Sequence, residues 1–240
     1  MVIMVENIKK APKHIGIIMD GNRRYAKKSG KLPWTGHEVG AKNMLNTIDW
    51  AKELGVKQLT FYAFSTENFK RPKLEFDNMM KLFIRLANKI LEKVKEAKNA
   101  ICIRFVGLLH LFPKHVREMM RKVMDATRKF KDFVVNIAVG YGARSELIKA
   151  FKSLFTKIKS GKLSIEQIDE QMVSKELFVS SEPEMIIRTG GAKRLSNFLL
   201  WQASYSEIYF LDKLWPEFSK QDLAYCINDY NSNVQINLGK

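Results

Sequence analysis

The segment HIGIIMDGNRRYAKK, residues 14–28, passes from an apolar run to a lone acid and then to several basic residues. The apolar residues of 14–19 are consecutive rather than alternating, which is typical of a β-strand buried on both faces. Asp20 and Gly21 follow this strand, and four positive charges come within the next seven residues. Asp-Gly and Asn also favour surface turns, so the rest of the chain has to show whether this acid has a function.

The composition indicates a folded, basic protein. Hydrophobic residues make up 46% of the 240 residues, which is enough for one large α/β domain or two small ones and argues against disorder. Lysine and arginine (41) outnumber aspartate and glutamate (25), giving a formal net charge of +16. Such a charge indicates an anionic partner: a nucleic acid, a membrane surface or phosphorylated small molecules.

The two cysteines, Cys102 and Cys226, lie far apart in apolar surroundings, and their spacing indicates neither a disulfide nor a zinc site. No apolar run approaches the roughly 20 residues of a membrane span. The first ten residues lack the order of a signal peptide, in which the charges precede the apolar core. We therefore expect a cytoplasmic protein.

Short apolar runs alternate with helical patterns along the chain. The clearest helical pattern covers 74–97, where apolar residues recur with a 3.6-residue period, and a second covers 113–129. Ser164 and Gln167 form a capping box for a short helix within the polar stretch 156–184. Runs typical of strands occupy six ranges: 14–19, 57–64, 101–106, 133–139, 184–188 and 205–210.

This alternation predicts a single α/β domain over residues 1–240. Its centre would be a mostly parallel six-stranded sheet flanked by helices. Residues 1–11 would form an N-terminal extension and residues 231–240 a C-terminal tail. No P-loop pattern occurs, and Gly140-Tyr141-Gly142 lacks the third glycine of a dinucleotide fingerprint, so the sequence does not favour a nucleotide cofactor.

Polar clusters follow three of the predicted strands. Asp20 follows the first strand, residues 65–71 follow the second, and residues 188–191 follow the fifth. Because ligands of open parallel sheets bind beyond the carboxyl ends of the strands, we expect the three clusters to converge at one edge. Arginines, glycine-exposed amides and helix N-termini are suited to phosphate groups, and one carboxylate among them could hold a divalent cation.

These residues resemble those of the cis-prenyltransferases, the family of undecaprenyl diphosphate synthase and dehydrodolichyl diphosphate synthase. The resemblance extends from about residue 12 to residue 230 and includes segments in the family's order. The matching segments are HIGIIMDGNRRYAKK, GHEVGAKN, LTFYAFSTENFKRPKLE, RTGG and RLSNFLLWQASYSEIYFLDKLWPEF. DGN alone would be a weak signal, whereas the set is specific.

The resemblance implies an enzyme that transfers prenyl groups and makes polyprenyl diphosphates. An allylic starter, farnesyl or geranylgeranyl diphosphate, would ionise, and isopentenyl diphosphate would attack it repeatedly to form cis double bonds. The growing chain would enter an apolar tunnel bordered by Ala63 and Phe83. The resemblance also implies Mg²⁺ as cofactor, assembly as a homodimer and no nucleic-acid partner. The hydrocarbon product suggests peripheral association with a membrane.

Individual roles follow from the matching positions. Asp20, Asn68 and Arg71 would be catalytic. Asp20 would also bind the metal, with Glu207 as a second acid near it, and Asn68 and Arg71 would lie near the condensing carbons and take part in proton removal. The resemblance assigns substrate binding to Gly21, Asn22, Arg23, Arg24, His37, Ser65, Glu67, Phe69, Arg188, Arg194 and Ser196. For Arg23, Lys27 and Lys28, a solvated helix face is favoured over a role as ligands. Glu75 could be no more than a helix first-turn charge.

Departures from the family pattern affect accessory positions. Pro33 stands where the family commonly has an arginine, Leu108 where an aspartate is usual, and Ala192-Lys193 where Glu-His or similar follows RTGG. The C-terminal Arg-x-Gly appears as Asn237-Leu238-Gly239. Two alternative functions stay open: a noncatalytic subunit of a cis-prenyltransferase, and a basic nucleic-acid-binding protein.

Overall fold

A central sheet of six parallel strands organises the protein, whose computed structural model describes residues 11–95 and 101–233. The strand order is β3-β4-β2-β1-β5-β6, and every pair of neighbours is parallel. The strands are β1 (His14–Ile18), β2 (Gln58–Ser65), β3 (Cys102–Val106), β4 (Val134–Tyr141), β5 (Met185–Arg188) and β6 (Glu207–Phe210). All six predicted strands are confirmed, and the sheet is wholly parallel in the described residues.

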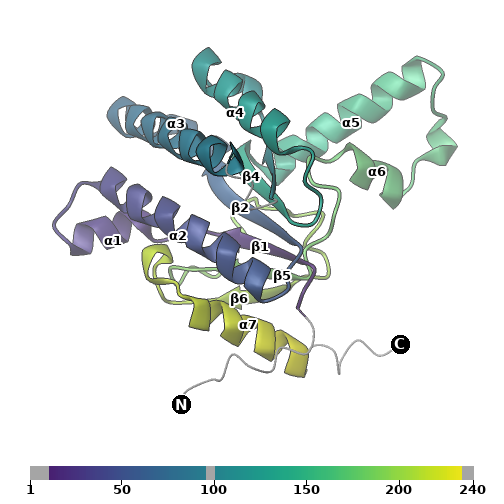
Figure 1. Cartoon of the computed structure of the whole chain (residues 1–240). Helices are drawn as coiled ribbons and strands as arrows, with labels where there is room; N and C mark the ends of the chain where they lie inside the picture. Colours follow the sequence, from purple (N-terminus) through teal and green to yellow (C-terminus); the bar gives the residue numbers. More distant parts are fainter. Residues whose placement is uncertain (1–10, 96–100, 234–240) are drawn as a thin grey trace.

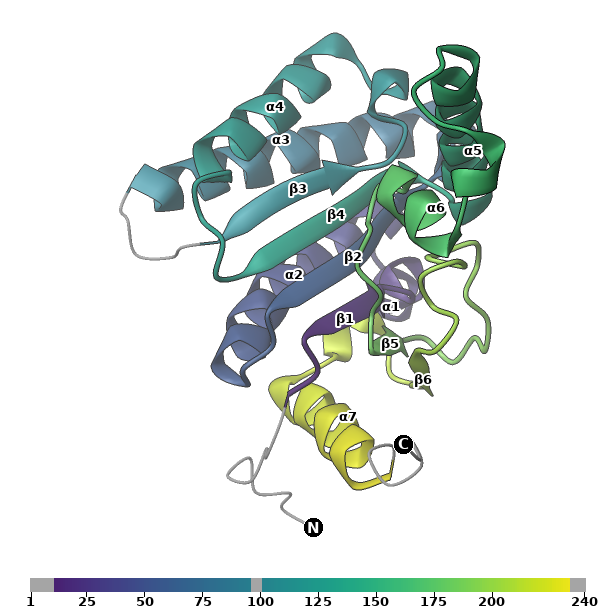
Figure 2. The same ribbon diagram turned by 90° about the vertical axis from the view of Figure 1, so that its right-hand side faces the viewer.

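Seven α-helices surround this sheet in the described part of the chain. They are α1 (Asn22–Lys28), α2 (Pro33–Glu53), α3 (Lys73–Lys95), α4 (Lys114–Thr127), α5 (Ala143–Lys159), α6 (Glu170–Glu176) and α7 (Lys220–Asn233). Short 3-10 helices cover Thr66–Lys70, Leu109–Leu111, Ile165–Gln167 and Trp215–Glu217. Figure 2 shows α2, α3 and α4 behind the sheet and α6 in front of it.

The two faces of the sheet have different cover. On one face, Ile17 and Phe61 belong to a large core cluster with residues of α2, α3, α4 and α7, the helices that line that side in Figure 1. On the other face, Ile18 and Ile186 pack with Phe198 from the long connection between β5 and β6. Both faces of β1 are therefore buried, which explains its consecutive apolar residues.

The predicted helices agree with α3 and α4 within a few residues. The capping box of Ser164 and Gln167 is present, but it caps a 3-10 helix rather than an α-helix. The sequence assigned no element to α2, which begins with Pro33 and buries Gly36 and Gly40 along one face. The polar stretch 156–184 ahead of β5 holds the end of α5, a 3-10 helix and the whole of α6, and α5 and α6 project from the body in Figure 1.

The chain ends set limits on two expectations. Helix α7 continues to Asn233, so the expected tail from residue 231 begins inside a helix. Asn237-Leu238-Gly239 lies outside the described residues, as does nearly all of the expected extension 1–11. Among the helices described, none is long and apolar enough to cross a membrane.

Candidate phosphate-binding site and apolar cavity

Asp20 lies directly beyond β1, at the carboxyl edge of the sheet, and is held from both its side chain and its backbone. The carboxylate accepts hydrogen bonds from Nη2 of Arg188 at 2.9 Å and from Nη2 of Arg24 at 3.1 Å. Its carbonyl oxygen accepts from the Trp215 amide at 2.9 Å and from the Thr189 hydroxyl at 2.8 Å. Asp20 therefore joins the ends of β1 and β5, as the sequence predicted.

Two glycines allow this close assembly of loops. Gly21 has φ +110°, and a Cβ there would lie 2.9 Å from Leu214. Gly190 has φ +85°, and a Cβ there would lie 2.5 Å from Nη2 of Arg24. Arg24 crosses above Gly190 and donates from Nη1 to its carbonyl oxygen at 2.7 Å. A larger residue at Gly21 would collide with the Leu214 backbone, one at Gly190 would displace the Arg24 side chain, and the positive φ would strain either substitution.

Arg188, Arg194 and Ser196 form the group that the resemblance assigns to isopentenyl diphosphate. Arg188 is buried and donates from Nη1 to the Ser196 hydroxyl at 2.7 Å and to the carbonyl oxygen of Arg194. Nε of Arg194 donates to the same hydroxyl at 3.2 Å. Arg188 thus links this group to Asp20, and the exposed Arg194 side chain has no carboxylate partner among the described residues.

A second charged cluster lies beside the first and centres on Glu75. Nη1 of Arg71 donates to the buried Glu75 carboxylate at 2.8 Å, and Arg23 lies 3.7 Å from the same oxygen. The expectation for Glu75 was no more than a first-turn charge, whereas the structure buries it between two arginines. Its spacing of four residues from Arg71 is a sequence signal that could have identified this pair.

His37 belongs to the same cluster and is held as a neutral acceptor. Nη1 of Arg71 lies 3.2 Å from Nε2 of His37. A guanidinium only donates hydrogen bonds, so Nε2 accepts and the ring proton sits on Nδ1. Burial, aided by the positive charge of Arg71, lowers the pKa of His37 to about 4.

The turn after β2 is built by its own polar side chains. The Ser65 amide donates to Oδ1 of Asn68 at 3.1 Å, and the two residues cap the turn reciprocally. Phe69 packs against Phe64, with ring centroids 4.9 Å apart. Glu67 is exposed. Its partial burial raises the pKa of the carboxyl group, but hydrogen bonds from its own amide and from the Ser65 hydroxyl outweigh this effect, and the pKa is lowered. Phe69 therefore has a packing role, and Asn68 keeps its amide nitrogen available.

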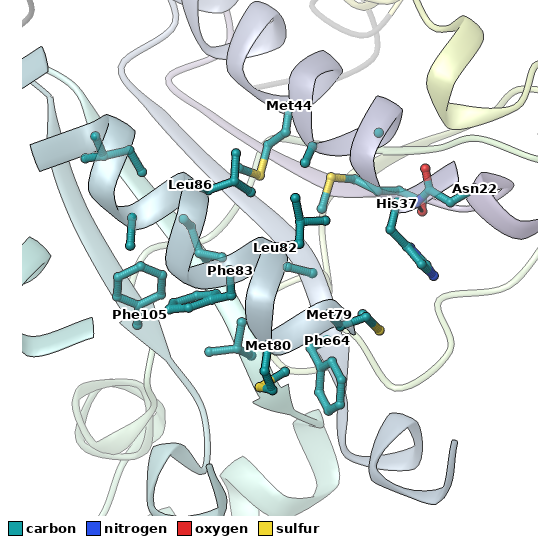
Figure 3. A pocket seen from close by; sticks show the side chains of 18 of the residues that line it. Asn22, His37, Met44, Phe64, Met79, Met80, Leu82, Phe83, Leu86 and Phe105 are labelled. Carbon is teal, nitrogen blue, oxygen red and sulfur yellow. Dashed lines mark hydrogen bonds between the residues drawn. The ribbon is translucent and has the colours of Figure 1, made fainter. Parts of the chain in front are cut away.

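Two adjoining hollows divide the site by polarity. The first, here called the phosphate cleft, has a volume of about 560 Å³. Its lining residues are Met19, Asp20, Gly21, Asn22, Arg23, Arg24, Lys27, Lys31, Pro33, His37 and Arg71. The second, here called the apolar cavity, has a volume of about 120 Å³ and lies between α2, α3 and the sheet (Figure 3). Met19, Asn22 and His37 line both hollows, so they mark the junction.

The apolar cavity is walled mainly by aliphatic and aromatic side chains. Ala63 of β2 and Phe83 of α3 both line it, as expected for residues bordering a tunnel. Figure 3 shows Leu86 of α3 pointing toward Met44 of α2, and Phe83 of α3 beside Phe105 of β3. A smaller hollow of about 60 Å³ lies further along the same helices and shares Met44 with it.

Glu207 is not near Asp20 within one chain. It begins β6 opposite Met185, the first residue of β5, whereas Asp20 lies beyond Ile18, which pairs with the last residue, Arg188. The two acids therefore occupy opposite edges of the sheet. In the described ranges no three acidic, histidine or cysteine side chains gather as a metal site. Mg²⁺ commonly uses one or two carboxylates together with substrate phosphates, so the partly exposed Asp20 fits it alone.

Known proteins are similar in sequence to this chain over almost its whole length. The Prenyltransf family model, described as "Putative undecaprenyl diphosphate synthase", matches residues 18–236. The tritrans,polycis-undecaprenyl-diphosphate synthase (geranylgeranyl-diphosphate specific) of Pyrococcus horikoshii is 43% identical over 231 residues, 95% of this chain and 88% of that protein. The enzyme of the same name from Methanocaldococcus jannaschii is 41% identical over 223 residues, 91% and 80% of the two chains.

Solved structures share its fold. The crystal structure of lavandulyl diphosphate synthase from Lavandula x intermedia, in complex with dimethylallyl diphosphate, has a TM-score of 0.88 and 31% identity. It covers 93% of this chain and 96% of its own. A "probable undecaprenyl diphosphate synthase" from Campylobacter jejuni has a TM-score of 0.78 and 35% identity, covering 93% and 97%. With the cleft, the cavity and these likenesses in agreement, the chain belongs to the undecaprenyl diphosphate synthase family of prenyltransferases.

Proposed function

We propose that this enzyme adds isopentenyl diphosphate units repeatedly to an allylic diphosphate starter and releases a long cis-polyprenyl diphosphate. The observation that carries this proposal is the junction of a basic cleft with an apolar cavity at Met19, Asn22 and His37. An allylic diphosphate has the same division, because a charged head is joined to a hydrocarbon tail. The geranylgeranyl specificity in the names of the archaeal relatives favours that starter over farnesyl diphosphate.

The first chemical step breaks the bond between the allylic carbon and the diphosphate oxygen, and the electron pair stays on that oxygen. Arg24 and Arg71 line the cleft and would donate to the leaving oxygens, while the Gly21 backbone allows close approach. Asp20 would hold Mg²⁺, which when bound offsets the negative charge that develops on the leaving group.

The second step joins isopentenyl diphosphate to the allylic cation, after which the added unit would lose a proton to a diphosphate oxygen beside it and a cis double bond would form. Arg188, Arg194 and Ser196 would bind the diphosphate of this second substrate beside Asp20. Asn68 and Arg71 would orient the condensing carbons. Arg71 acts there as a donor, because a guanidinium keeps its protons in proteins.

Product analysis tests the proposal directly. The purified protein is incubated with radiolabelled isopentenyl diphosphate, MgCl₂ and either geranylgeranyl or farnesyl diphosphate. We expect labelled long-chain products after dephosphorylation, more from the geranylgeranyl starter, and none with EDTA. Activity that appears only after a second subunit is added would instead identify a noncatalytic partner. Tight, steeply salt-dependent binding of generic DNA would support the nucleic-acid alternative.

We also propose a homodimer. Ile148, Phe151 and Phe155 lie on one face of α5 and are 55%, 52% and 66% exposed. An apolar helix face of this kind is typical of an interface. Light scattering should give the mass of two chains, and the double variant Phe151→Asp/Phe155→Asp should give one. Leu111→Asp, which changes an exposed apolar residue elsewhere, should remain dimeric.

Peripheral attachment to membranes is the last part of the proposal. The net charge of +16 would attract anionic headgroups, and the hydrocarbon product has to enter a bilayer. Sedimentation with vesicles should show binding to anionic lipid that falls as salt is raised. Equal binding to neutral vesicles would contradict an electrostatic attachment.

A further inference from the structure

Lys27 and Lys31 line the phosphate cleft without any role in the site described so far. Lys27 is the last but one residue of α1, and Lys31 lies four residues further on in the link to α2. The Lys31 amide donates to the Ala26 carbonyl oxygen at 2.9 Å, which folds the link back over the end of α1. The sequence favours a solvated helix face for Lys27, whereas the structure places it on the cleft.

The pairing of charges around the cleft separates these lysines from the arginines. Asp20 is paired with Arg24 and Arg188, and Glu75 is paired with Arg23 and Arg71. Two carboxylates therefore offset part of the charge of four guanidinium groups. Within the ranges that the structure describes, neither lysine forms an ion pair. Lys27 and Lys31 are thus the cleft cations whose charge no carboxylate offsets.

The position of the lysines relative to the junction indicates which part of a ligand they meet. Met19, Asn22 and His37 line both hollows and so mark the end of the cleft where a hydrocarbon tail would enter. Lys27 and Lys31 line only the cleft. A diphosphate whose tail passes the junction would therefore direct its terminal phosphate toward the part of the cleft that the lysines form.

We propose that Lys27 and Lys31 bind the terminal phosphate of the allylic diphosphate and, after ionisation, the inorganic diphosphate that it releases. This inference rests on the proposed function and extends it. When the carbon–oxygen bond breaks, the electron pair adds one negative charge to the diphosphate, so two unpaired ammonium groups stabilise the leaving group more than the bound substrate.

The same residues would serve the repetition of the reaction. In each cycle inorganic diphosphate leaves the cleft, and the diphosphate that came with isopentenyl diphosphate becomes the head of the new allylic chain. A site that receives a different anion each cycle is served by flexible, solvated lysines, which hold phosphate as point charges rather than in a rigid bidentate geometry. Pro33 lines the cleft beside them and offers no charge of its own.

Lys28 and Lys42 provide a matched control. Both are exposed, Lys28 on α1 beside Lys27 and Lys42 on α2, and neither lines the cleft. The variant Lys27→Met/Lys31→Met and the control Lys28→Met/Lys42→Met lose the same net charge. Long-range steering by charge would weaken anion binding equally in the two proteins, whereas contact would weaken it only in the first.

Calorimetric titration with inorganic diphosphate in the presence of MgCl₂ is the primary measurement. We expect the dissociation constant to rise about tenfold or more in Lys27→Met/Lys31→Met and to change less than about twofold in the control. Steady-state kinetics should show a rise in KM for geranylgeranyl diphosphate together with a fall in kcat, because the lysines stabilise the leaving group more than the substrate, with KM for isopentenyl diphosphate nearly constant. Thermal melting checks that both variants are folded.

Equal diphosphate binding in the two double variants, or an equal rise in both KM values, would overturn the assignment of these lysines. Failure of the proposed function would look different. The wild-type protein would then incorporate no isopentenyl diphosphate, yet the titration would still report whether the lysines contact a diphosphate.

Discussion

Nη2 of Arg188 lies 2.9 Å from Oδ2 of Asp20, although the two residues are 168 positions apart in the sequence. Arg188 ends β5 and Asp20 follows the neighbouring strand β1, so the register of the sheet brings them together. Arg188 also donates to Ser196, which lies in the loop assigned to the second substrate. One arginine therefore connects the carboxylate proposed to bind metal with the site proposed for isopentenyl diphosphate.

Asp20→Ala is expected to reduce incorporation of isopentenyl diphosphate by at least about 100-fold, because the cleft loses the carboxylate that would hold the metal. The fold should survive, since Arg188 keeps its bonds to Ser196 and to the Arg194 carbonyl oxygen. Incorporation and thermal melting are measured together, with Asp125→Ala on the exposed face of α4 as the control. Near-normal incorporation by the Asp20 variant would remove its assigned role.

Arg194→Ala should raise KM for isopentenyl diphosphate by about tenfold or more while changing KM for the allylic starter much less. Its Nε contacts Ser196 beside Arg188, and it does not line the phosphate cleft. Loss of one charged hydrogen-bond donor typically costs about 1.5–3 kcal/mol. Initial rates at varied concentrations of each substrate separate the two constants. A matching rise in both would argue against separate diphosphate sites.

Ala63→Leu should shorten the product, because Ala63 lines the apolar cavity and a larger side chain would occupy its space. Each isoprene unit adds about five carbons, and burial at roughly 0.8 kcal/mol per carbon favours elongation by on the order of 4 kcal/mol per unit. The chain therefore grows until it meets a wall, and detergent or lipid should accelerate product release.

Product lengths are compared by mass spectrometry after dephosphorylation. Ala126→Leu on α4, which does not line the cavity, should leave the distribution unchanged. If a folded, active Ala63→Leu enzyme makes products of wild-type length, β2 does not border the path of the chain.

His37 gives the stability of the protein a pH dependence. Its pKa is lowered to about 4 in the folded protein, chiefly by burial, from a value of 6.5. The unfolded chain therefore takes up a proton that the folded protein excludes. The free energy of unfolding should fall as the pH drops from about 6.5 to about 4, by up to roughly 1.4 kcal/mol per pH unit from this residue.

Burial also lowers the pKa of His14 to about 4, so its contribution adds to the same window. Urea unfolding of wild type and His37→Gln at pH 7, 6 and 5 isolates the share of His37. The variant should lose less stability per pH unit than wild type. Parallel slopes would show that His37 titrates alike in the folded and unfolded chains.

The sheet was predictable because its information is local. Strands covered on both faces need consecutive apolar residues, and each of the six runs showed them or a β-rich composition. The convergence of Asp20, Arg71 and Arg188 was predictable for a topological reason, since the carboxyl ends of parallel strands share one edge. The structure places all three there.

Features that depend on contacts between distant elements were not predictable from pattern alone. The buried face of α2 carries Gly36 and Gly40, which lower helix propensity, and a Cβ at Gly40 would lie 2.1 Å from the Asn22 side chain. The burial of Glu75 depends on how α1 and α2 pack beside α3. Glu207 was expected near the metal by resemblance, but the register of β6 places it at the other edge.

The junction at Met19, Asn22 and His37 would make the catalytic step and the proposed control of product length separable traits. The phosphate cleft would bind the charged head and the apolar cavity the hydrocarbon tail, and few side chains line both. Substitutions on α3 can therefore move the end wall without disturbing the arginines. A lineage could diversify its lipid carriers in this way, residue by residue, while its catalytic step stays under unchanged selection.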